Sequence, residues 1–342
     1  MREILLEKKN LYISVYRRLE KEVIALADSI SFDDTQKNVY SSMIGDIILR
    51  CSTDIEAISK DLYYRLKPEK KTGKENKNLH FDYCCLVLLM KEWKIDKRRI
   101  YISHPNMHFS DCELVPLLYV DKKLDDDPNN TKICRWKQAY QKIKHNRTEN
   151  ISKATVWNML NALGALYILN LYYADESFWF ETPIGKRREY TDSSDIFTPD
   201  LYDATEIDFS DLNNNKSIVV PEESVFVLKY EDKAYENVQK SYYVSHIATN
   251  LKSFISQQYK DSPAMIGRDW LNVIKAQQET RDAGLKSKEI VLNKNKGSVY
   301  SCPSLQEFYE SGEYEKYVNK YLNDPEFLKL INEEYAHLLN NS

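Results

Sequence analysis

The chain has 342 residues, of which 42% are hydrophobic and 29% charged, and a formal net charge of −4. This length suits two domains with a substantial core. The net charge excludes a general polyanion binder, so any affinity for nucleic acid must come from a local patch. Only 8 glycines occur, which disfavours a glycine-rich nucleotide fold and favours helices. The 25 tyrosines are typical of the edges of helical cores, where the hydroxyl reaches water.

The six cysteines form no CxxC pair and have no histidine at zinc-ligand spacing. They therefore predict reduced thiols in a cytoplasmic protein, with no metal and no cofactor. The first residues are charged and amphipathic, unlike a secretory signal. Phosphate-binding glycine loops, the HExxH zinc motif and the GxSxG nucleophile elbow are all absent from the sequence.

The first half of the chain reads mainly as helices. Apolar residues step by three and four along Ile47, Cys51, Ile55, Ile58 and Leu62, which makes this the clearest helix of the sequence. The expected elements are helices over 2–28, 35–66 and 79–93, a stretch over 94–111 with the strand-like or loop segment 100–102 and a loop around Pro105, a short apolar piece over 113–119, an acidic loop over 121–130 and a helix pair over 132–174. They predict an all-α bundle of about five helices over 1–175.

The composition changes after residue 175. Residues 176–216 are rich in aspartate and predict an irregular acidic connection. Residues 217–342 predict a small α+β region, with strands over 217–220 and 225–230, helices over 235–259 and 263–284, a hairpin of 289–292 with 298–300, and short helices after 303. The predicted fold class is thus mainly α, a helical bundle followed by a small α+β C-terminal region.

The helix pair over 132–174 organises the functional predictions. Its first helix carries an apolar stripe of Trp136, Tyr140 and Ile143 among many basic residues, with one acid, Glu149, in the stretch. Its second helix, over 154–174, carries no charge and is apolar nearly all round, so it is either a buried core helix or a membrane span. Three interrupting asparagines and several small residues favour the core helix, and no membrane partner is predicted.

The polar cluster Lys144-His145-Asn146-Arg147 joins the two helices. Together with Trp136, Tyr140 and the apolar helix opened by Ala154 and Thr155, it resembles bacterial members of the HEPN superfamily, over roughly residues 35–174. The resemblance implies a helical bundle, often a homodimer, that targets RNA in defence or toxin-type systems, and frequently a metal-independent ribonuclease. In that chemistry a histidine moves the proton of the ribose 2′-hydroxyl and an arginine offsets the charge on the phosphate.

The resemblance assigns catalytic roles to His145 and Arg147. It places Lys144, Asn146, Tyr140 and Arg135 as RNA or phosphate contacts. The sequence departs from the family pattern, in which the histidine follows the arginine by four to six residues, because here His145 precedes Arg147. On a continuous helix these two side chains would point about 200° apart, so the helix must end at Asn146 for them to converge.

Two alternatives stand beside the ribonuclease hypothesis. The cluster can be a helix cap, with Arg147 paired to an acid such as Asp54 or Glu56. The whole chain can be a non-catalytic interaction or scaffold module, whose C-terminal region binds a protein partner. Arg99 and His104 do fit the arginine-to-histidine spacing, but they flank a strand-like segment before a proline and are interpreted as a coincidence.

Overall fold

The computed structural model describes residues 2–72, 79–118, 120–121, 132–174, 194–205, 217–239, 287–294, 298–301 and 310–312. The chain divides into two compact units, each built from several chain segments. One unit comprises 1–202, 220–227 and 290–297, and the other comprises 203–219, 228–289 and 298–342. The predicted boundaries at 175 and 216 stay predictions, because 175–193 and 206–216 lie outside the described residues.

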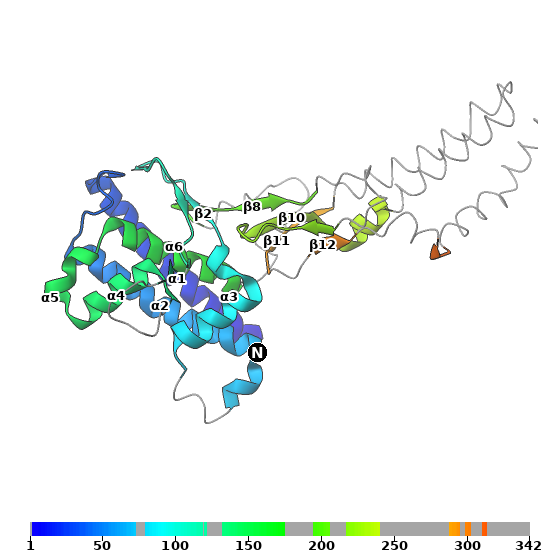
Figure 1. Cartoon of the computed structure of the whole chain (residues 1–342), viewed down its shortest axis with the longest axis horizontal. Helices are drawn as coiled ribbons and strands as arrows, with labels where there is room; N and C mark the ends of the chain where they lie inside the picture. Colours follow the sequence, from blue (N-terminus) through cyan, green and yellow to red (C-terminus); the bar gives the residue numbers. More distant parts are fainter. Residues whose placement is uncertain are drawn as a thin grey trace, which may run out of the picture. The chain divides into compact units, whose positions relative to one another are not determined.

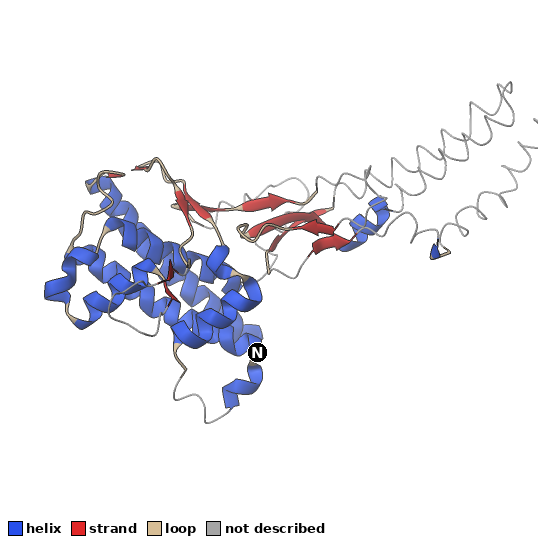
Figure 2. Cartoon of the chain, viewed as in Figure 1, coloured by secondary structure: helices blue, strands red, loops and turns tan. Residues whose placement is uncertain are grey.

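Helices form the main body of the first unit (Figures 1 and 2). Their bounds are α1 Arg2–Ser29, α2 Ser42–Leu66, η1 Pro68–Thr72, the π-helix η3 Phe81–Leu86, α3 Val87–Trp93, η4 Ile95–Lys97, α4 Arg135–His145, α5 Arg147–Asn150, η5 Ile151–Lys153 and α6 Val156–Ala174. α2 begins at Ser42 rather than at residue 35, because the Ser41 side chain caps it by accepting a hydrogen bond from the Ile44 amide. α3 ends where Lys94 adopts a left-handed conformation, with φ of 53°.

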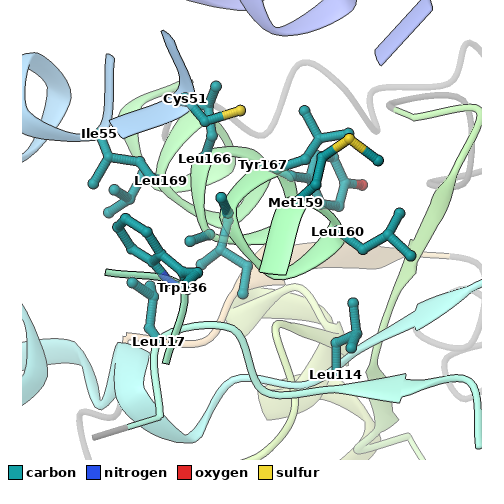
Figure 3. Close-up of a cluster of buried hydrophobic side chains, with 14 of the residues drawn as sticks. Cys51, Ile55, Leu114, Leu117, Trp136, Met159, Leu160, Leu166, Tyr167 and Leu169 are labelled. Atoms are coloured by element: carbon teal, nitrogen blue, oxygen red, sulfur yellow. The ribbon is translucent and has the colours of Figure 1, made fainter. Parts of the chain in front are cut away.

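α6 is the central helix of the core, as the uncharged sequence predicts. Almost its whole circumference is buried, and Figure 3 shows its side chains Met159, Leu166 and Leu169 among residues of other elements. The Asn161 and Asn170 amides donate to the Trp157 and Leu166 carbonyls within the helix, and the Asn158 amide donates to the Lys153 carbonyl just before it. In the part of the chain that the structure describes, no helix is long and apolar enough to cross a membrane.

Buried thiols line the same core. Burial raises the pKa of Cys85 and of Cys134 to about 12, and raises the pKa of Cys51 further. These three cysteines, with Cys84 and Cys112, are free thiols. The expectation of reduced cysteines is therefore confirmed for the five that lie in the described residues.

Short strands also belong to the first unit, so the prediction of a mainly α chain is wrong. Among the described residues 58% are helical and 16% lie in strands, which makes the fold mixed α+β. The strands are β1 Phe32–Asp33, β2 Ile100–Ile102, β3 Met107–His108, β4 Glu113–Leu114, β5 Val120–Asp121, β6 Lys132–Ile133 and β7 Phe197–Pro199. β2 lies between β4 and β7 in one antiparallel sheet, and β1 pairs with β3 in parallel.

The strands of the first unit were missed in the sequence for a physical reason. β2 is only three residues long, with Ile100 and Ile102 buried and Tyr101 between them, so its alternation is too short to be distinguished from a loop. Its partner β7 comes from the stretch that was predicted to be an irregular acidic connection, about a hundred residues further along. A pairing across that distance leaves no local signal in the sequence.

Two buried polar side chains form hydrogen bonds that connect distant chain segments within the first unit. Glu20 is 3% exposed and accepts hydrogen bonds from the Tyr16 hydroxyl at 2.8 Å and from the Asp195 amide at 3.0 Å. Arg98 is fully buried and donates to the carbonyls of Trp93, Glu222, Ser224 and Asn293. Arg98 thereby joins residues from three separate segments of the unit.

The remaining strands are β8 Leu201–Asp203, β9 Ser217–Val219, β10 Phe226–Tyr230, β11 Lys288–Leu292 and β12 Ser298–Ser301. The strands expected near 217, 225, 289 and 298 are confirmed. The predicted hairpin is wrong, because β11 lies beside β10 in the order β11-β10-β8, whereas β12 pairs with β9. A helix begins at Asp232; the expected continuation to 259, the helix over 263–284 and almost all of the segment after 303 lie outside the described residues.

Candidate nucleic-acid interface

α4 divides its residues cleanly between core and surface. Trp136, Ala139 and Ile143 are buried, and the Trp136 indole donates to the Pro116 carbonyl at 2.8 Å, which fixes the rotation of the helix. The exposed residues of the helix are Arg135, Lys142, Lys144 and His145. α4 contains no acidic residue, so its exposed face is basic along its length.

The predicted break between the two helices is confirmed. α4 ends at His145, and Asn146 leaves helical geometry with φ of −149° and ψ of 87°. The Asn146 side chain then accepts the Glu149 amide as the N-cap of α5, so this residue ends one helix and begins the next. The divergence expected on a continuous helix therefore does not apply to His145 and Arg147.

Arg147 is held by the beginning of α2. Its Nη1 lies 2.8 Å from Asp46 Oδ1, and its Nη2 donates to the Ser42 carbonyl at 2.7 Å. The sequence suggested Asp54 or Glu56 as an ion-pair partner, and the partner is instead Asp46. Both side chains are about half exposed, 40% for Arg147 and 54% for Asp46, so the pair stabilises the fold by at most about 1 kcal/mol.

Tyr140 is largely buried, and its hydroxyl accepts a hydrogen bond from Lys144. The Lys144 ammonium donates to the Tyr140 hydroxyl at 3.2 Å, and this hydrogen bond raises the pKa of Lys144. Tyr140 is only 8% exposed, which leaves little of its ring for a ligand, while Lys144 is exposed. The structure therefore makes Lys144 the accessible member of the pair.

His145 and Arg135 are both exposed, and neither forms a hydrogen bond or ion pair with other described residues. They lie at opposite ends of α4, ten residues apart, which corresponds to about 15 Å along the helix axis. Arg135 is therefore not part of the cluster around Asn146, although it lies on the same basic helix.

A buried ion pair fixes the inner side of α4. Lys137 pairs with Asp82 of η3, with side chains that are 3% and 10% exposed, and the Lys137 ammonium also lies 5.3 Å from the centre of the Phe81 ring. This contact ties α4 to η3, so it sets the position of the basic face without contributing to its exposed charge.

The first residues of α2 and the segment before it complete this surface, and sequence reasoning missed them. Tyr40 forms an isolated antiparallel bridge with Thr155, and the Val156 amide donates to the Val39 carbonyl at 2.9 Å. A Cβ placed on Gly45 would lie 3.4 Å from Ala154 Cβ, which shows how closely α2 approaches the start of α6. The only available signal was Ser41, whose cap marks Tyr40 as preceding the helix.

Arg99 and His104 have local partners. Arg99 Nε lies 3.3 Å from the Glu113 carboxylate, and His104 Nδ1 accepts the Asn106 amide at 3.2 Å. Both residues therefore have structural contacts of their own, Arg99 beside the β2–β4 strand pair and His104 in the turn after β2. Their arginine-to-histidine spacing needs no catalytic explanation.

The surface formed by α4 and the turn after it thus carries exposed ammonium groups, an exposed imidazole and a guanidinium in a weak surface ion pair. No family model matches this chain, and neither a curated protein nor a solved structure matches it.

Proposed function

We propose that this protein binds RNA through the exposed basic face of α4 and the turns that follow it. The observation that carries the proposal is the charge of residues 135–153, which hold six lysines and arginines and a single acid, Glu149, in a chain of net charge −4. Arg135, Lys142 and Lys153 are exposed and form no ion pair with other described residues. Cations of this kind bind phosphates and release counterions.

Arg147 supports the same proposal despite its contact with Asp46. A half-exposed pair is weak, so the guanidinium can exchange the carboxylate for a phosphate, to which it binds in a bidentate manner, at small cost. His145 lies two residues away, across the helix break, and its exposed imidazole is a side chain of the kind that most often serves as a general acid or base. Metal-independent cleavage of RNA, with His145 as the acid–base group and Arg147 on the phosphate, is the catalytic form of the proposal.

The experiment that tests binding measures retention of a single-stranded RNA of about 20 nucleotides at several salt concentrations. We expect the affinity to fall steeply with salt, and the double variant Lys142→Gln/Lys144→Gln to reduce the slope of log K against log salt by about one per lost phosphate contact. Lys91→Gln on α3 is the matched control, since Lys91 is also exposed. RNA retention that is absent or insensitive to salt would reject the proposal.

Cleavage is tested separately, in EDTA, with the same RNA. We expect His145→Ala to abolish cleavage and to weaken binding only slightly, because the exposed lysines and arginines of residues 135–153 remain to attract the phosphates. Cleavage that persists in His145→Ala would remove this residue from the chemistry and leave the binding proposal intact.

One specific observation favours the second candidate, a non-catalytic helical interaction or scaffold module. Arg147 contacts two groups of α2 and so has a structural use that needs no substrate. Folded protein that neither retains nor cleaves RNA would favour this alternative, as would a stable complex with a protein partner that survives high salt.

A further inference from the structure

An exposed aromatic side chain lies beside the proposed interface. Tyr40 is 52% exposed, and it forms no ring contact and no side-chain hydrogen bond with other described residues. Met43, three residues later, is 45% exposed. Tyrosine normally buries most of its ring or hydrogen-bonds its hydroxyl, and among the described residues Tyr40 does neither.

The backbone beneath Tyr40 is fixed from both sides. Tyr40 bridges to Thr155, its neighbour Val39 accepts the Val156 amide, and Ser41 caps α2. The ring is thus carried on an ordered segment, which lowers the conformational entropy lost when it contacts a ligand.

Two cations lie near Tyr40 through contacts of its backbone neighbours. Lys153 is exposed and lies two residues before Thr155, the bridge partner of Tyr40. Arg147 donates to the carbonyl of Ser42, two residues after Tyr40. Two acids also contact this region: Asp46 pairs with Arg147, and Asp34 pairs with Lys37, three residues before Tyr40.

From this arrangement we infer that Tyr40 stacks on a base of single-stranded RNA while Arg147 and Lys153 contact the flanking phosphates. An aromatic face flanked by cations is the arrangement with which proteins bind unpaired nucleotides, since every base has a face to stack and every linkage a charge. A paired duplex keeps its bases inside the helix and cannot offer one to Tyr40. The inference rests on the proposed RNA binding and adds the structural class of the RNA and the residue that selects it.

The test compares a 20-nucleotide single strand with the blunt duplex of the same sequence, using the full chain at one fixed salt concentration. We expect Tyr40→Ala to weaken single-strand binding by about 5- to 150-fold, the range found when a stacking aromatic is removed. Affinity for the duplex should change by less than about twofold. Tyr40→Phe should restore single-strand binding, while Tyr40→Leu should behave like Tyr40→Ala, because only an aromatic face stacks.

Val87→Ala on α3 is the matched control, because Val87 is 46% exposed and lies outside the proposed interface. An unchanged single-strand affinity in Tyr40→Ala, with the salt-sensitive binding still present, would overturn the stacking inference alone. A Tyr40→Ala variant that loses a protein dimer rather than RNA affinity would overturn it equally, since Tyr40 would then belong to a protein interface. Wild-type protein that retains neither RNA would overturn both proposals.

Discussion

At the scale of single residues, the contact between Arg147 and Asp46 decides how much positive charge the turn after α4 offers. The pair is half exposed and lies near the beginning of α2, where Asp46 neutralises part of the positive charge of Arg147. Its small contribution to stability means that the charge balance here can be changed without unfolding the protein.

Asp46→Asn is therefore expected to strengthen RNA binding. The change frees the Arg147 guanidinium and removes one negative charge, so the salt slope should increase by about one phosphate contact. The free energy of unfolding should fall by less than about 1 kcal/mol. Filter binding over a salt series and urea unfolding provide the two measurements. Glu92→Gln, an exposed acid of α3, is the control; equal gains in both variants would mean that net charge alone acts.

At the scale of elements, the Lys137–Asp82 pair joins α4 to the π-helix η3. Asp82→Asn would leave a buried ammonium without its counter-charge, so we expect the free energy of unfolding to fall by about 3–5 kcal/mol. The double variant Asp82→Leu/Lys137→Met should recover most of that loss, because it removes both charges. Urea unfolding measures each variant.

The control for the buried pair is the exposed pair of Lys60 and Glu56, whose side chains are 36% and 37% exposed. Glu56→Gln should lower stability by less than about 1 kcal/mol. A loss in Asp82→Asn as small as that in Glu56→Gln would show that Lys137 reaches water and that the pair does not fix α4.

Two helical glycines distinguish tight packing from ordinary packing. A Cβ on Gly164 of α6 would lie 2.8 Å from Ile100 Cδ1 and 3.0 Å from Pro116 Cγ, and the proline ring cannot move aside easily. Gly164→Ala should therefore lower stability by about 1–3 kcal/mol, although alanine favours the helix. Gly45→Ala in α2 meets its nearest atom at 3.4 Å and should raise stability by up to about 1 kcal/mol. Thermal unfolding of both variants checks the contrast, and equal shifts would contradict it.

The sequence predicted the elements whose signals are local. Ile47, Cys51 and Ile55 repeat at helical spacing and do lie on the buried face of α2, and the uncharged run after Ala154 is the buried helix α6. The break at Asn146 followed from its polar neighbours. In contrast, the pairing of β2 with β7 joins residues about a hundred positions apart, so no window of sequence could show it.

The same contrast between local sequence signals and tertiary contacts applies to the candidate site. The exposed charges of α4 were predictable because the apolar stripe of Trp136 and Ile143 fixes which face points outward. The partner of Arg147 was not, since Asp46, Asp54 and Glu56 all lie on the same long helix and only tertiary packing selects among them. Tyr40 was missed because a helix predicted from residue 35 would have enclosed it.

At the scale of the molecule, the first unit is assembled from segments that are far apart in the chain. Arg98 shows the consequence most clearly, because three of its four carbonyl acceptors belong to Glu222, Ser224 and Asn293. Val225 and Phe226, buried in the same core cluster, come from one of these later segments. A cut after the helices would thus remove part of the core of the unit that contains them.

A fragment of residues 1–202 is therefore expected to fail to fold cooperatively. It would keep Arg98 but lose the Glu222, Ser224 and Asn293 carbonyls. Each unsatisfied charged donor costs more than the roughly 1–3 kcal/mol of a neutral one, against a total stability of about 5–15 kcal/mol. Near-ultraviolet circular dichroism and urea unfolding, compared with the full chain, measure the effect. Arg98→Met in the fragment should recover part of the loss by removing the buried charge, although the apolar contacts of Val225 and Phe226 stay missing. A fragment that unfolds with the midpoint of the full chain would show that the helical segments form their core without the later strands.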